Sequence, residues 1–212
     1  MAQCVRWYLA YSLSLGNLEE MMAERGVQVD HSTVHRWILK ITPIFNKISL
    51  KYKKPVHQFW HIDETYIKIK GKWYYLYRAI DSTGKTVDFL LTKYRDMQAA
   101  RRFFKNAISN HACPIKVMID KSSANKKAIE SFNSGFTRYK TITIRQNKYM
   151  NNRIEQDHRF IKKRVRAMLG FKSFRSAQII LSGIELMHMI RKGQFNFMGS
   201  NDSRGSLYQL VS

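Results

Sequence analysis

Three carboxylates stand where a folded chain could bring them together, in a protein with only 15 acidic residues. Asp63 lies inside the aromatic and β-branched run 60–65, which is predicted to be a strand. Asp120 directly follows a second predicted strand at 115–119, and Glu155 lies in the first turns of a predicted helix. A charged group within or beside an apolar strand is costly unless it is paired or binds a metal. These three residues are therefore candidate metal ligands.

The chemistry that such a set could perform is phosphoryl transfer. Carboxylates are hard oxygen ligands, which Mg²⁺ prefers, and Mg²⁺ keeps positions open for water and phosphate. Two such ions about 4 Å apart can activate an attacking oxygen and stabilise a leaving one. Taken singly, each residue has a simpler interpretation: Asp63 or Asp120 as a turn or edge residue, and Glu155 as a solvated residue paired with Arg159.

Other carboxylates compete for this site. Because neighbouring side chains on a strand point to opposite faces, we expect only one of Asp63 and Glu64 to join it. On a helix, Asp157 lies about 200° around from Glu155. The other rivals are Asp81, which is expected in a turn, and Asp88.

The charge of the chain favours a polyanionic partner, above all nucleic acid. Lysine and arginine total 37, which gives a formal net charge of +22. Basic residues also cluster with aromatic ones, at Lys68, Lys70, Lys72, Trp73, Tyr74 and Tyr75. No apolar run approaches the roughly 20 residues that span a bilayer, and no signal peptide opens the chain, so we expect a cytoplasmic protein without a membrane partner.

The cysteine content argues against two further classes of protein. Cys4 and Cys113 are the two cysteines, they lie far apart, and neither has a CxxC partner. We therefore expect neither a disulfide framework nor a zinc site.

The first 41 residues are predicted to be short helices with the pattern of a helix-turn-helix DNA-binding module. Gly16 is expected to end the first helix, Asn17 to cap the second and Gly26 to stop it. Ser32 is expected to cap the third. From spacing alone, a plain helical hairpin is about equally compatible with this pattern.

The rest of the chain is predicted to be an α/β domain. A basic connector at 42–57 leads to three strands at 59–70, 73–81 and 86–92, which short turns join into an antiparallel meander. The later elements follow in chain order. They are a helix capped by Asp96, a strand at 115–119, a helix near 124–132, a strand at 141–144, a long helix opening at Asn151 or Asn152, and a last helix capped by Ser173. This order matches a ribonuclease-H-like fold, a mixed sheet flanked by helices, as one option among several. The expected catalytic domain is 58–192, and a polar tail follows at 193–212.

Several blocks of the chain resemble one family, the DDE transposases of bacterial insertion sequences, in the branch typified by insertion sequences six and twenty-six. The resemblance runs from near residue 5 to about 192. Family members usually carry more chain before the first block, so we expect a short first helix here. The matching blocks are Arg6-Trp-Tyr8, Ala23-Glu-Arg-Gly26, Asp30-His-Ser-Thr-Val-His-Arg-Trp37, His61-Ile-Asp-Glu-Thr-Tyr-Ile-Lys-Ile-Lys-Gly-Lys-Trp73 continuing to Asp81, Lys148-Tyr-Met-Asn-Asn-Arg-Ile-Glu155 continuing to Lys162, Gly170-Phe-Lys-Ser173 and Gly183-Ile-Glu-Leu-Met-His-Met-Ile-Arg-Lys192.

The resemblance implies a triad of Asp63, Asp120 and Glu155, with 34 residues between the last two. It places the expected basic residue, two helical turns after the glutamate, at Lys162. It also implies two Mg²⁺ ions, for which Mn²⁺ can substitute, and an enzyme that binds the terminal inverted repeats of its element. Such an enzyme cleaves double-stranded DNA to free 3′-hydroxyls and joins them to target DNA, working as a homodimer or larger homo-oligomer.

The DNA-reading residues are predicted within the third helix, where Ser32, Thr33, His35 and Arg36 are candidate groove or phosphate contacts. Arg159 and Lys162 share a helix face with Glu155 and are candidate phosphate contacts. Val34, Trp37 and Ile38 are predicted to be core residues. Two other functions stay open at this point: a ribonuclease-H-like nuclease without strand transfer, and a non-catalytic DNA-binding remnant or regulator.

Overall fold

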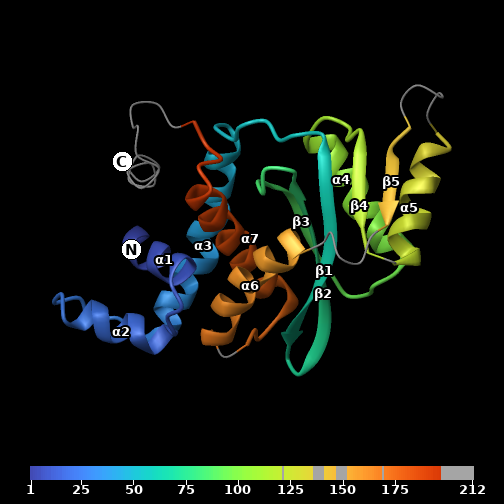
Figure 1. Cartoon of the computed structure of the whole chain (residues 1–212). Coiled ribbons are helices and arrows are strands. Elements are labelled where there is room, and N and C mark those ends of the chain that lie inside the picture. The colour runs from blue at the N-terminus through green and yellow to red at the C-terminus, as the bar shows by residue number, and fades with distance from the viewer. Residues whose placement is uncertain (121, 136–140, 147–151, 169, 197–212) are drawn as a thin grey trace. The chain divides into compact units, whose positions relative to one another are not determined.

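The computed structural model of the chain describes residues 1–120, 122–135, 141–146, 152–168 and 170–196 (Figure 1). The chain forms two compact units. The sheet unit is Pro55–His158, and the helical unit combines Met1–Lys54 with the chain from Arg159 onward. The predicted opening of a helix at Asn151 and the part of the predicted polar tail beyond residue 196 lie outside the described residues.

The sheet unit is built on a five-stranded mixed sheet with the strand order β3-β2-β1-β4-β5. The first three strands pair antiparallel, whereas β4 pairs parallel with both β1 and β5. This is the ribonuclease-H-like sheet that the sequence predicts, and the meander is confirmed to within one residue. The strands are β1 Phe59–Ile69, β2 Lys72–Asp81, β3 Thr86–Thr92, β4 Lys116–Ile119 and β5 Thr143–Gln146.

Two helices cover one face of this sheet, α4 Met97–Asn110 and α5 Ser123–Asn133. Asp96 caps α4 as predicted, because its side chain accepts a hydrogen bond from the Ala99 amide. The core between sheet and helices is apolar and fully enclosed. It includes Trp60, Ile62, Tyr77, Ala79, Val87, Phe103, Phe104, Val117, Ile119 and Ile129. This core holds β1 and β4 rigidly side by side, which fixes the positions of residues at their ends.

The opposite face of β1 and β2 carries the residues that contact the start of α6, Asn152–Ala167. Side chains alternate along a strand, so Asp63 points away from the face on which Ile62 packs. Arg78 lies directly across from Asp63 on β2 and shares its face. These residues meet Asp157 and His158 of α6, still within the sheet unit.

The helical unit contains α1 Ala2–Ala10, α2 Leu15–Ala23, α3 His31–Leu50 and α7 Phe174–Arg191. As predicted, the first helix is short and Ser173 caps α7. Packing groups α7 with α1 and α3, so the expected 58–192 boundary does not coincide with the compact units. Gly183 permits this close approach, since a Cβ there would lie 2.7 Å from atoms of Leu9 and Thr42.

Three predicted helix boundaries are wrong. Ser14 caps α2 through a capping box with Asn17, so Gly16 and Asn17 lie inside the helix. Asp30, not Ser32, caps α3 by accepting a hydrogen bond from the Thr33 amide. The prediction for Gly26, in contrast, agrees with the structure. Its φ of +73° is typical of a residue that stops a helix.

The start of the predicted connector at 42–57 is also wrong, because α3 continues to Leu50 through Pro43. A proline inside a helix removes one hydrogen bond and disfavours the helix by about 3 kcal/mol. Buried side chains spaced by one turn offset this term on the packed face of α3, namely Ile38, Thr42, Phe45 and Ser49. Within the part of the chain that the structure describes, no helix combines the length and hydropathy needed to cross a membrane.

Candidate active site

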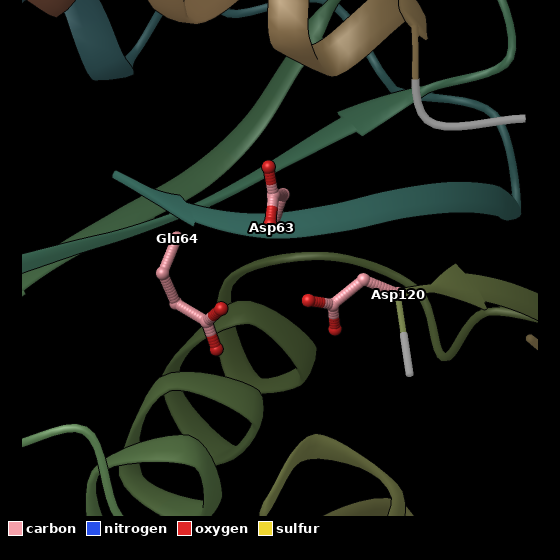
Figure 2. A group of neighbouring side chains, drawn as sticks. All are labelled: Asp63, Glu64 and Asp120. Atoms are coloured by element: carbon pink, nitrogen blue, oxygen red, sulfur yellow. The ribbon is translucent and has the colours of Figure 1, made fainter. Parts of the chain in front are cut away.

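The parallel pairing of β1 and β4 brings two of the predicted ligands together. Ile62 pairs with Ile119, so Asp63 and Asp120 are the next residue on each of two adjacent strands. Glu64 joins them: one carboxylate oxygen from each of the three residues lies within 4.8 Å of the others (Figure 2). The prediction that only one of Asp63 and Glu64 could join the site is therefore wrong. The two side chains leave β1 on opposite faces, but the Glu64 side chain is long enough to reach toward Asp120.

Glu64 is the buried member of this group, with a side chain only 2% exposed. Asn125 of α5 donates from Nδ2 to Glu64 Oε1 at 2.8 Å, and Arg95 lies 3.1 Å from Oε2. Burial raises the pKa of Glu64 to about 7, an effect that Arg95 and Asn125 oppose and that the charges of Asp63 and Asp120 reinforce. A carboxylate at this position is thus costly to ionise while the site holds no cation.

Arg95 links Glu64 to Asp120, because its Nη2 also lies 3.4 Å from Asp120 Oδ2. The Ser122 amide donates to the other oxygen of Asp120 at 2.8 Å. The Asp120 carboxylate is therefore fixed from both sides, and about a third of it is exposed to solvent. The sequence analysis did not identify Arg95 or Asn125. Their position just before α4 and in the first turn of α5, at the carboxyl edge of β4, is the signal that could have found them.

A second set of contacts orients Asp63. His158 Nε2 lies 3.3 Å from Asp63 Oδ2, and His158 Nδ1 lies 3.3 Å from Arg78 Nη1. Arginine can only donate hydrogen bonds, so Nδ1 must be the acceptor and the imidazole proton is on Nε2, facing the carboxylate. Arg78 is fully buried, and its Nη2 donates to Asp157 at 2.6 Å. Histidines and charged groups behind a metal ligand commonly fix its orientation in this way.

The third member of the predicted triad, Glu155, lies on an exposed part of α6, one turn before His158. Among the described residues, the carboxylates that approach one another within 4.8 Å are Asp63, Glu64 and Asp120, without Glu155. Arg159 and Lys162 are exposed farther along the same helix.

The rival carboxylates have other roles in the fold. Asp81 was expected in a turn but is the last residue of β2, and its side chain accepts hydrogen bonds from the amides of His57, Thr83 and Lys85 around the turn that follows. Asp157 pairs with Arg78, and Asp88 accepts a hydrogen bond from Asn110.

The candidate DNA-reading residues begin α3 in the helical unit. The hydroxyl groups of Ser32 and Thr33 donate to Asp30, and Arg36 donates to the Thr33 hydroxyl. His35 is half-buried, and burial, with a smaller effect of Lys172, lowers its pKa. Of the predicted core residues, Val34 and Ile38 are fully buried, whereas Trp37 is half-buried.

The donor set at the carboxyl edge of β4 suits a divalent cation. It consists of closely spaced, hard carboxylate oxygens, which Mg²⁺ and Mn²⁺ prefer. Burial, with a smaller effect of the Asp63 and Asp120 charges, raises the pKa of Glu64, and a bound cation would favour its charged form.

Comparison with known proteins agrees with this geometry. Residues 57–194 match the family described as DDE domain. A transposase for the insertion sequence-like element IS431mec of Staphylococcus aureus strain Mu50 is 44% identical over 188 residues, which cover 89% of this chain and 82% of that protein. The transposase for insertion sequence element IS257 in transposon Tn4003, also of Staphylococcus aureus, is 43% identical over the same shares.

Solved structures give a weaker likeness. The HTLV-2 integrase catalytic core domain in complex with magnesium, in its dimeric form, has a TM-score of 0.49 and 18% identity, over 73% of this chain and 97% of that one. The catalytic core domain of BIV integrase has a TM-score of 0.46 and 13% identity, over 72% of this chain and 94% of that one.

The mixed sheet and its clustered carboxylates, together with the DDE domain match, define a DNA strand-cleaving and strand-joining enzyme that uses a divalent metal. The chain belongs to the DDE transposases of bacterial insertion sequences, in the branch typified by insertion sequences six and twenty-six, as the sequence blocks predicted.

Proposed function

We propose that Asp63, Asp120 and Glu155 hold two Mg²⁺ ions, for which Mn²⁺ can substitute, and that this site cleaves and joins DNA at the terminal inverted repeats of the protein's own element. The observation that carries the proposal is the meeting of the Asp63 carboxylate, within β1, and the Asp120 carboxylate, directly after the parallel strand β4. Glu155 has the sequence spacing of the family pattern and lies one helical turn before His158, whose Nε2 is 3.3 Å from Asp63 Oδ2.

Two bound ions supply activation of the attacking oxygen and stabilisation of the leaving oxygen in an in-line displacement. The chain supplies position and charge, which is most of what phosphoryl transfer asks of a protein. Arg95 and the Ser122 amide hold Asp120 in place, and His158 holds Asp63. Glu64 adds negative charge beside both aspartates and thereby strengthens the attraction for cations.

The rest of the chain supplies DNA binding in this proposal. Ser32, Thr33, His35 and Arg36 read or contact the element end from the first turns of α3. Arg159 and Lys162 contact phosphate beside the carboxylates, since they continue the exposed face of the helix that carries Glu155. The enzyme acts in the bacterial cytoplasm as a homodimer or larger homo-oligomer on double-stranded DNA, one active site for each element end.

The direct test is Mg²⁺-dependent cleavage of the 3′ strand on labelled DNA that carries the element's own end. Asp120→Asn and Glu155→Gln are expected to lower cleavage by at least a hundredfold and to leave DNA binding within about twofold, because each substitution removes a metal ligand and no surface. Glu130→Gln is the matched control, since Glu130 is an exposed carboxylate on α5 that pairs with Lys126.

The outcomes separate the possible activities. Cleavage that persists in Glu155→Gln would remove that residue from the site and would leave Glu64 as the third ligand. Cleavage without joined products on a labelled target duplex would identify a nuclease without strand transfer. Binding without any cleavage by the wild-type protein would contradict the proposed activity for this chain.

A further inference from the structure

We infer that the outer part of the β1–β2 hairpin is a second DNA-contacting surface, which binds the DNA strand next to the scissile phosphate by base stacking and phosphate pairing. This surface, called the hairpin strip, consists of Tyr66, Lys68, Trp73 and Tyr75. The inference rests on the proposed function, because it takes the carboxylates as the place of cleavage.

The hairpin strip continues the face of the sheet on which Glu64 lies. On β1, Tyr66 and Lys68 follow Glu64 at two-residue steps, so their side chains share its face. Across the ladder, Tyr75 pairs with Tyr66 and Trp73 pairs with Lys68. Because β-strands rise about 3.3 Å per residue, Tyr66 begins roughly 7 Å from Glu64. The strip therefore starts at the candidate active site and leads outward from it.

Helices α4 and α5 cover this face of the sheet near the core and leave it uncovered at the hairpin. In Figure 1, the ends of β1 and β2 that the turn joins extend away from α4 and α5. Trp73 is 59% exposed and Tyr66 is 51% exposed. The other face of the same hairpin is buried, since Ile67 and Ile69 are at most 2% exposed. The hairpin is thus a fixed platform with its aromatic side open, not a loosely held loop.

The turn that ends the hairpin is also well defined. Lys70 and Gly71 both have positive φ, 47° and 78°, and they form a two-residue loop between paired Ile69 and Lys72. Positive φ at both central residues is the requirement of the type I′ turn, whose twist matches that of the flanking strands. The turn therefore presents the strip in one orientation.

The chemistry of the strip fits DNA. Tyr66 and Trp73 lie edge to face with ring centroids 6.2 Å apart, and the Lys68 ammonium group lies 5.7 Å from the Trp73 ring. From Tyr66 to Arg78 the chain has no acidic residue and has lysine at positions 68, 70 and 72. Exposed aromatic rings flanked by lysines stack on bases and pair with phosphates, independently of sequence. A large apolar protein partner would require an apolar surface instead of one rich in lysine.

The experiment measures binding and catalysis by Trp73→Ala, Trp73→Phe and Lys68→Ala in the full-length protein. Binding is measured in a Glu155→Gln background, so that cleavage does not interfere. The matched controls are Phe59→Ala and Lys116→Ala, because exposed Phe59 and half-buried Lys116 form a similar aromatic–lysine pair, 5.9 Å apart, at the other end of β1 and in β4. Thermal unfolding checks that each variant folds.

The expected result is about tenfold weaker DNA binding for Trp73→Ala, with most of the affinity kept in Trp73→Phe. Lys68→Ala should lower the slope of log affinity against log salt by about one. If the strip binds the element end, Trp73→Ala also lowers cleavage of that end without target DNA. If it binds target DNA, cleavage is unchanged and strand transfer falls.

The inference is overturned if Trp73→Ala binds, cleaves and joins DNA as the wild type does, or if the Phe59 and Lys116 controls lose as much binding. Failure of the proposed function has a different signature. In that case Asp120→Asn would cleave normally, while the binding measurements on the strip, which need no cleavage, would still be decisive.

Discussion

At the scale of single residues, Glu64 is the least expected member of the site. Strand alternation predicted correctly that it leaves β1 on the face opposite to Asp63. Alternation fixes only the direction of the Cα–Cβ bond, and the side chain beyond it follows Asn125 and Arg95 toward Asp120. Those partners come from positions 31 and 61 residues farther along the chain. A single sequence holds no local sign of such contacts, so the group of three carboxylates required the fold.

The burial of Glu64 predicts a pH dependence of stability in metal-free protein. Its pKa is raised from 4.5 to about 7 in the folded state, so the folded protein keeps a proton that the unfolded chain releases. Stability should therefore be full below about pH 4.5, fall as the pH rises toward 7, and then level off. The loss is on the order of 1–3 kcal/mol.

Glu64→Gln removes this titration and should give a flatter stability curve between pH 4.5 and pH 8. The measurement is the urea unfolding free energy of both proteins in chelator. Histidines titrate alike in both, so the difference between the two curves isolates Glu64. Glu130→Gln, which alters an exposed carboxylate, should run parallel to the wild type. Parallel curves for Glu64→Gln would show that Glu64 is ionised throughout.

At the scale of elements, the first turns of α6 are held against the sheet by charged contacts. Ile154 and Ile161 of this helix are fully buried. The helix also places Asp157 against buried Arg78, and His158 between Arg78 and Asp63. The same turn of helix that carries Glu155 is therefore tied to the strand that carries Asp63. Removing these charged contacts should lower both the stability of the fold and the rate of strand cleavage. The two effects can be measured separately.

We predict that Arg78→Met and Asp157→Leu each destabilise the protein by about 3–5 kcal/mol, because each leaves a buried charge without its partner. The double variant should recover most of that stability in urea unfolding, since it buries no lone charge. Its strand cleavage should stay at least tenfold low, because His158 loses the donor that fixes its tautomer toward Asp63.

The comparison for this double variant is the exposed pair Lys126 and Glu130 on α5, whose loss should change stability by less than about 0.5 kcal/mol. Cleavage at the wild-type rate by the stable double variant would mean that the Arg78 network supports the fold alone.

The elements themselves were largely predictable from the sequence, and the errors have local causes. The three strands of the meander were bounded by turn residues and alternated clearly, so they were placed to within one residue. The predicted helix boundaries were wrong where two sequence signals competed. Gly16 suggested the end of the first helix, but the capping box of Ser14 and Asn17 starts α2 before it. Pro43 suggested a connector, but the buried turn-spaced stripe through Phe45 outweighed it. In both places a favourable contact of a few kcal/mol decided against the intrinsic preference.

At the scale of the whole molecule, sequence order and packing divide the chain differently. The DDE match ends at residue 194, yet α7 packs with α1 and α3 in the helical unit. The sequence predicted the last helix and its Ser173 cap, but a helical pattern could not say which elements would cover that helix. The ends of the chain are thus combined in one unit, so the helices that carry the candidate DNA-reading residues are stabilised by the C-terminal helix.

The charge of the whole molecule leads to the last prediction. With a net charge of +22, much of the DNA affinity should come from phosphate contacts that release counterions. If six to ten phosphates are contacted, affinity should fall by roughly 10³–10⁵ between about 50 and 200 mM salt. Binding of Glu155→Gln to the element end and to a scrambled duplex, measured across this range, should give similar steep slopes with a constant offset, because base contacts add affinity with little dependence on salt. Affinity that does not change with salt would contradict the assignment of the basic surface to DNA. A steep slope of log affinity against log salt for the element end alone would mean that phosphate contacts form only after the end is recognised.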